Sequence, residues 1–275
     1  MQDGRLVVAG TNGNVAISAD DGFNWHRGRV DRDRPWSQIL RMRQAASGVV
    51  FALGVGALHA SADGGESWRV LPRSWDIQID NPFPASDMAL SVDGSALLVT
   101  SCDYNTKSDA ASSGLHRSDD GGLTWKCVHF DGDTAFGAVA ELRDGTLLVA
   151  NRGGLDRFDG RRWQRCYSYD VSDIVVEGEY VWIAAHPGIL VSTDSGASWS
   201  QVIEANRSID RFAVAGDAVC AVAGVDVFSS LDGGANWRTH KSPRPLRAVA
   251  LSAEVAIGVG GDGAVERISL RERSK

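Results

Sequence analysis

The sequence has few of the residues that build disulfides, metal sites or nucleic-acid-binding surfaces. Its four cysteines, Cys102, Cys127, Cys166 and Cys220, show no Cys-x-x-Cys spacing, and none of the six histidines clusters beside them. This pattern favours buried, reduced thiols, and we expect no metal and no cofactor. Positive charge is also scarce, since 28 Lys and Arg stand against 35 Asp and Glu and give a net charge of −7. Because phosphate backbones are bound by basic surfaces, nucleic acid is not expected as the main partner.

Long apolar segments are missing as well. No stretch approaches the roughly 20 apolar residues that a transmembrane helix needs. The first residues, Met1–Arg5, have neither the basic start nor the apolar run of a signal peptide. We therefore expect a soluble protein without membrane insertion, located in the cytoplasm or in a virion.

The most informative feature present is a motif, Ser-x-Asp-x-Gly-x-x-Trp, that occurs five times. A degenerate sixth copy keeps Gly160 and Trp163 but has Phe158 in place of the motif's Asp. The tryptophans of the six copies recur with a period near 40 residues. The Asp and Trp residues of the five complete copies are Asp20 and Trp25, Asp63 and Trp68, Asp120 and Trp125, Asp194 and Trp199, and Asp232 and Trp237.

A period of about 40 residues with short strands and abundant glycine is typical of an all-β propeller with one antiparallel sheet per repeat. We expect four strands per blade, with the motif on the turn between the third and fourth strands. The second strand of each blade is visible as a short apolar run, typical of strands buried on both faces. The seven runs are Leu6–Ala9, Val49–Leu53, Leu97–Thr100, Leu147–Ala150, Val181–Ala184, Val219–Val222 and Val255–Val259.

Seven runs predict seven blades, although the first and last repeats are each short of a strand. Merging these two incomplete repeats gives six blades as the alternative. We expect a single domain over residues 1–270, followed by a basic tail at 271–275.

The repeated motif is best explained as a turn. Its Asp can accept hydrogen bonds from nearby backbone N–H groups, and its Gly supplies a backbone conformation with positive φ. Its Trp is expected to bury against its own blade and the next one. Five equivalent acids spaced around a ring cannot all serve one active site, so we interpret them as structural.

The motif resembles the Asp-box, or bacterial-neuraminidase repeat, of sialidases and related propellers. The compact repeat at residues 48–68 is most similar to that of photosystem II assembly-factor-like propellers. This resemblance implies a non-catalytic scaffold whose function lies on the loops at the opposite end of the blades from the motifs. The sialidase fold is implied without sialidase activity, because the chain has no Arg-Ile-Pro motif and little loop material for a pocket.

Long connections on that opposite face are the candidate binding segments. They are residues 72–87 and 101–114, with an arginine-rich segment at 27–36 on the same face. Aromatic and charged side chains there suit contacts with a protein or a sugar. The candidate binding residues are Arg32, Arg34, Trp36, Trp75, Asp76, Asp103, Tyr104, Arg152, His186 and Arg207.

These observations predict a non-enzymatic interaction scaffold whose partners are other proteins, either an assembly factor or a phage tail component. The alternative is a carbohydrate-binding or glycoside-hydrolase propeller that acts through the same loops. No spacing of loop carboxylates selects a catalytic pair.

Overall fold

The computed structural model describes the chain except for short terminal and connecting segments. The described residues are 5–10, 14–30, 38–55, 57–71, 85–105, 110–131, 135–205, 208–251, 255–261 and 263–270. They divide into two compact units, residues 1–164 and 165–275. A single domain over residues 1–270 stays a prediction. The tail at 271–275 lies outside the described residues.

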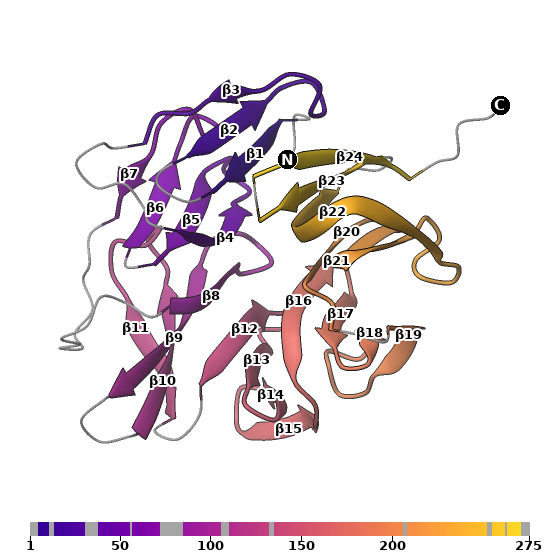
Figure 1. The fold of residues 1–275 in the computed structure, drawn as a ribbon. Helices are drawn as coiled ribbons and strands as arrows, with labels where there is room; N and C mark the ends of the chain where they lie inside the picture. Colours follow the sequence, from indigo (N-terminus) through magenta and orange to yellow (C-terminus); the bar gives the residue numbers. More distant parts are fainter. Residues whose placement is uncertain are drawn as a thin grey trace. The chain divides into compact units, whose positions relative to one another are not determined.

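The first unit consists of consecutive antiparallel sheets (Figure 1). The first sheet has three strands and the next three have four each, the last of which carries the chain across the boundary between the units. The strands are β1 (Leu6–Ala9), β2 (Val15–Ser18), β3 (His26–Arg27), β4 (Ile39–Gln44), β5 (Val50–Gly54), β6 (Ala57–Ser61), β7 (Arg69–Val70), β8 (Ala85–Leu90), β9 (Leu97–Asn105), β10 (Ala110–Ser118), β11 (Lys126–Asp131), β12 (Phe136–Glu141), β13 (Leu147–Asn151), β14 (Gly154–Phe158) and β15 (Trp163–Tyr167).

The second unit continues the same meander with one four-stranded and one five-stranded sheet. Its strands are β16 (Val171–Glu177), β17 (Tyr180–Ala185), β18 (Gly188–Ser192), β19 (Ser200–Glu204), β20 (Arg211–Ala215), β21 (Ala218–Ser230), β22 (Arg238–Leu251), β23 (Val255–Gly260) and β24 (Val265–Ser269). Six of the seven apolar runs predicted as strands fall within strands of the structure, and the run Val49–Leu53 overlaps β5 from Val50 onward.

The fold is an all-β propeller with four-stranded antiparallel blades, but the prediction of seven blades is wrong. The described residues form six sheets. The strands expected to form a seventh blade join the sheet of the preceding repeat, because β22 runs for 14 residues without a break and pairs with both β21 and β23. Pro243 and Pro245 lie inside β22. Each disfavours helical backbone in the residue before it, which favours an extended connection between the two sets of strands.

Buried apolar side chains form the core between neighbouring sheets within each unit. The second strand of a sheet is the most buried, as in β5 and β13, where every residue is buried. Trp68 packs with Val15 and Ile17 of the preceding sheet and with Val50 and Ala52 of its own. The expectation that the motif tryptophans pack on the following blade is therefore wrong for Trp68.

No helix among the described residues is long and apolar enough to cross a membrane. The segment 101–114, expected to be a loop, is largely an extended hairpin of β9 and β10, with residues 106–109 outside the described part. The hairpin is held by nine paired positions, from Ala110↔Asn105 to Ser118↔Leu97.

Candidate functional site

Each of the five complete motifs forms a turn closed by its serine and aspartate. In the turn between β6 and β7, Ser61 Oγ donates to Asp63 Oδ1 at 2.7 Å and accepts from the backbone N–H of Gly65 at 2.8 Å. Asp63 Oδ1 also accepts from the backbone N–H of Ser67 at 2.9 Å. The equivalent serine-to-aspartate hydrogen bonds of the other turns are Ser18–Asp20, Ser118–Asp120, Ser192–Asp194 and Ser230–Asp232.

These hydrogen bonds keep the motif aspartates ionised. Hydrogen bonds from the Thr124 side chain and backbone lower the pKa of Asp120 to about 2. Partial burial opposes ionisation of Asp63, but the hydrogen bonds from Ser67 outweigh it, and its pKa is also lowered to about 2. The pKa values of Asp20, Asp194 and Asp232 are lowered to about 2 by hydrogen bonds of the same kind. Their lone pairs are engaged within the turns, so none of the five is suited to donate a proton at neutral pH.

The motif glycine has two roles, one conformational and one in packing. Gly122 has φ +87°, and a Cβ added there would lie 2.7 Å from Leu71 Cδ1 in the preceding sheet. A Cβ at Gly234 would lie 3.2 Å from the ring of Trp182, again in the preceding sheet. The turn therefore seats its backbone directly against a neighbouring sheet, where a side chain would not fit.

The tryptophan indole closes the turn from the other side. Trp68 Nε1 donates to the carbonyl of Gly65 at 2.9 Å, and the indoles of Trp25, Trp125 and Trp237 make the same bond. The buried Nε1 of Trp199 has no hydrogen-bond partner among the described residues. The polar edge of the ring is thus satisfied in four turns while the apolar body packs in the core.

Sequence reasoning missed a second left-handed position in every complete turn. The residue before the motif glycine also has positive φ, between 55° and 71°. It is Gly64, Gly121 or Gly233 in three turns, and Asp21 or Ser195 in the other two. The Gly-Gly pairs in three copies were the available signal.

The candidate binding residues are only partly described. Arg32, Arg34, Trp36, Trp75, Asp76 and Arg207 lie outside the described residues. Asp103 and Tyr104 lie in β9, where their backbones pair with Ser112 and Ala111.

Arg152 and His186 are exposed, on the β13–β14 and β17–β18 turns, at the ends of their sheets away from the motif turns. They belong to different units. Tyr167 Oη donates to the His186 carbonyl at 3.1 Å, and the rings of Tyr167 and the exposed Tyr169 lie 5.7 Å apart. Partial burial, and secondarily Tyr169, raises the pKa of Tyr167.

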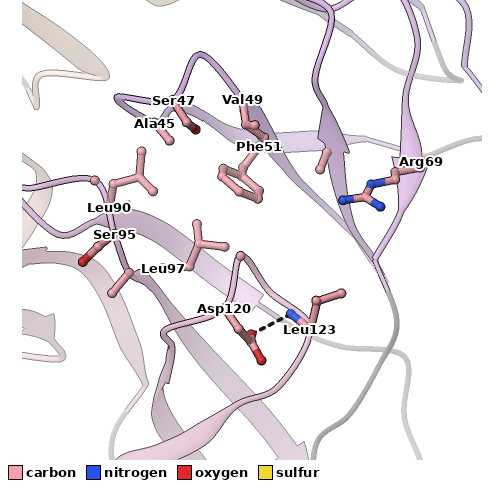
Figure 2. A pocket seen from close by; sticks show the side chains of 14 residues that line it. Ala45, Ser47, Val49, Phe51, Arg69, Leu90, Ser95, Leu97, Asp120 and Leu123 are labelled. Carbon is pink, nitrogen blue, oxygen red and sulfur yellow. Dashed lines mark hydrogen bonds between the residues drawn. The ribbon is translucent and has the colours of Figure 1, made fainter.

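A cavity of about 240 Å³ lies at the other end of the sheets, beside a motif turn. Its walls come from the β4–β5 turn, the β8–β9 turn and the β10–β11 motif turn, with β7 contributing Arg69. Figure 2 shows Val49, Phe51, Leu90 and Leu97 around it and Arg69 directed toward it from β7. No sequence pattern predicted this site, because its walls come from segments far apart in the chain.

The lining combines apolar side chains, among them Phe51 and Leu97, with Ser47, Ser95 and the directed cation of Arg69, and this mixture suits an organic group that carries negative charge. Within the described residues, no group of three or more His, Cys, Asp or Glu side chains could hold a metal ion. The fold and its repeated turns define the class of protein: an all-β propeller with four-stranded blades, in which hydrogen-bonded Ser-Asp-Gly-Trp turns join neighbouring strands of the same sheet.

Comparison with known proteins adds a relative within this class. No family model matches the chain. A stretch of 206 residues is 26% identical to the photosystem II assembly lipoprotein Ycf48 of Synechococcus sp. (strain CC9902). The match covers 70% of this chain but only 57% of that relative's length.

Two solved structures of YCF48 share the fold. YCF48 from Cyanidioschyzon merolae is 16% identical with a TM-score of 0.64, and the match covers 97% of this chain and 91% of that one. YCF48 bound to a D1 peptide is also 16% identical, with a TM-score of 0.65 and coverage of 97% and 88%. At this identity the two structures establish the propeller fold alone.

Proposed function

We propose that this protein is a non-enzymatic interaction module that binds a peptide segment of a partner protein during assembly of a complex. The observation that carries the proposal is the joint likeness to Ycf48: 26% identity over 206 residues, and a shared fold with a YCF48 structure that holds a peptide. We assign the repeated turns to the Asp-box type on their motif and hydrogen bonds.

The chemistry of the repeated turns supports a non-enzymatic role. The five recurring carboxylates are the most regular acids of the chain, and all five are engaged in turn hydrogen bonds, with pKa values lowered to about 2. A general acid at neutral pH needs a pKa near the working pH. No feature of the described residues favours the phage-component or carbohydrate alternatives.

The test begins with capture of a partner. The full-length tagged protein is incubated in native lysate, cross-linked, and its bound proteins are quantified by mass spectrometry, while light scattering gives its own mass. The proposal expects one stoichiometric protein partner, of which a short synthetic segment binds the purified protein one to one by calorimetry. Hydrolysis of glycosides in an activity screen, or the lack of any partner segment that binds, would overturn it.

The placement of that contact is tested on the two described members of the predicted binding face. Arg152→Ala and His186→Ala are expected to weaken binding of the partner segment. Arg143→Ala is the matched control, since Arg143 is equally exposed but lies on the β12–β13 turn at the other end of its sheet. If all three variants bind the partner segment with the same affinity, the contact does not lie on the predicted face, and the protein-binding role still stands.

A further inference from the structure

We propose that the cavity beside the β10–β11 turn is a second peptide-anchoring site, which takes one aliphatic side chain followed by an acidic residue of a partner protein. The inference rests on the proposed role as a protein-interaction module and adds a contact beside a motif turn of the first unit.

The size and lining of the cavity fit one apolar side chain. Its volume of about 240 Å³ is below the roughly 300–1,000 Å³ of pockets that bind whole small molecules. Phe51 and Leu97 are buried members of the core cluster between the β4–β7 and β8–β11 sheets, and Val49 and Leu90 pack against that cluster. A side chain entering the cavity therefore extends an existing core, which gives the apolar part of the binding energy.

Arg69 supplies the charge. It is exposed, and it has no hydrogen bond or salt bridge to any described residue. Figure 2 shows its guanidinium directed toward the cavity across from Leu90 and Ser95. A planar guanidinium with no partner among the described residues can donate paired hydrogen bonds to a carboxylate.

Asp120 also lines the cavity, but its carboxylate is already satisfied. It accepts from the Ser118 hydroxyl, from the backbone N–H groups of Leu123 and Thr124, and from the Thr124 hydroxyl. The dashed line in Figure 2 marks the bond from Leu123. The charge that remains available to a ligand is therefore the positive charge of Arg69.

The turn geometry favours an acidic side chain over a C-terminal carboxylate. Terminal carboxylates are commonly captured by a nest of backbone N–H groups. Here the N–H groups of Gly122, Leu123 and Thr124 are all used inside the turn, by Ser118 or Asp120. Among the described residues that line the cavity, Arg69 is the cation, so the occupant is an internal peptide segment with an aliphatic residue and a nearby Asp or Glu.

The test uses a random linear dodecapeptide library panned against the full-length protein. The enriched peptides should contain Leu, Ile or Met followed within two positions by Asp or Glu. Affinity of the best peptide, measured by calorimetry, should fall about tenfold in Arg69→Gln, the scale expected for one charge-assisted pair. It should be lost in Ser47→Phe, which places a ring at the mouth of the cavity. Arg143→Gln, an exposed arginine in the equivalent end of the next sheet, should bind like the wild type.

Arg69→Gln changes one exposed side chain, so its circular dichroism and melting temperature should match the wild type and keep the test valid if Ser47→Phe does not fold. Enrichment of other sequences, no enrichment, or equal binding by wild type and Arg69→Gln would overturn the cavity proposal. If the lysate partner is still captured by Arg69→Gln in those cases, the interaction role stands and only this site falls.

Discussion

Two kinds of turn in this protein carry an aspartate, a glycine and a tryptophan, yet they contact their surroundings differently. In the complete turn between β10 and β11, a Cβ at Gly122 would collide with Leu71 of the preceding sheet. In the degenerate turn between β14 and β15, Gly160 has nearly the same φ, +88° against +87°, but nothing lies within 4 Å of the same position. The left-handed glycine is therefore a property of the turn itself, whereas close contact with the preceding sheet is seen in the complete turn and not in the degenerate one.

The aspartates and tryptophans show the same division. Asp159 accepts from the backbone N–H groups of Arg161 and Arg162, which closes a tight turn without a serine. Trp163 stacks on Phe158 and lies against His129, with ring centroids 5.1 and 4.5 Å away. In the complete turns, by contrast, four of the five indoles bond back to the motif glycine. The degenerate turn keeps hydrogen bonds from backbone N–H groups to its aspartate. It lacks the serine hydroxyl that bonds to the aspartate in the complete turns, and its indole packs on aromatic rings.

The largest expected effect separates the two kinds of tryptophan. Trp68 is 6% exposed and joins the core of two sheets, so Trp68→Ala should cost about 3–5 kcal/mol of unfolding free energy. Trp163 is only partly buried, so Trp163→Ala should cost about 2 kcal/mol. Urea unfolding followed by far-ultraviolet circular dichroism measures both. Equal costs would show that the degenerate turn is anchored as firmly as the complete one.

A second comparison tests the packing role of glycine. Gly122→Ala should cost about 3 kcal/mol, since it adds a clash with Leu71 to the strain of positive φ. Gly160→Ala should cost about 1 kcal/mol, because only the strain applies. Thermal and urea unfolding of the two variants gives the difference.

The control for this pair is the double variant Gly122→Ala with Leu71→Val. Shortening Leu71 removes the atom that the new Cβ would meet, so the double variant should be more stable than the sum of the single changes by at least about 0.5 kcal/mol. Strict additivity would contradict the clash and leave backbone strain as the whole cost of Gly122→Ala.

The sequence predicted local features well because each of them depends on residues that lie close together in the chain. The seven apolar runs became strands, and Ser61, Asp63, Gly65 and Trp68 take part in the turn that their spacing predicted. These outcomes depend on hydrogen bonds and backbone angles within eight residues. A propeller therefore follows from its repeat, with each turn readable on its own.

The features that sequence reasoning missed depend on how segments meet. The predicted blade count was wrong at Pro243 and Pro245, where the extended strand β22 joins two sets of strands into one sheet. The cavity is lined by Phe51, Leu97 and Asp120, which come from three separate turns and strands, so no local sequence pattern predicts it. Hydrogen bonds and backbone angles within one segment were enough to predict the repeat. The register of the long strands and the spaces between sheets could be seen only in the folded structure.

Acid should weaken the protein through its motif aspartates. The pKa of Asp120 is lowered to about 2 in the folded protein from the ordinary aspartate value of 3.8, so between these values the unfolded chain binds more protons. Stability from this group is present above about pH 4 and is lost as the pH falls toward 2. The other four motif aspartates contribute to the same dependence of stability on pH.

The measurement is the melting temperature from pH 6 to pH 2 for the wild type, Asp120→Asn and Asp159→Asn. Asp120→Asn should be less stable at pH 6 and should lose less on acidification than the wild type. Hydrogen bonds from Arg162 and Arg161 also lower the pKa of Asp159, but that turn has no serine or threonine hydroxyl bonded to its carboxylate. Its variant should therefore flatten the curve less, and parallel curves for all three proteins would contradict the assignment.

The smallest expected effect concerns the second left-handed position, which sequence reasoning missed. Asp21 has φ +55° where Gly64, Gly121 and Gly233 occupy the same place in other turns. Asp21→Gly should relieve the strain of a side chain in the left-handed region and stabilise the protein by about 0.5 kcal/mol, a gain reduced by the added freedom of the unfolded chain. The melting temperature should rise by about 1–2 °C. Asp21→Ala keeps a Cβ and removes the side chain that tolerates this backbone best, so it should lower the melting temperature. A rise with alanine as large as with glycine would show that the charge of Asp21, and not its backbone, limits this turn.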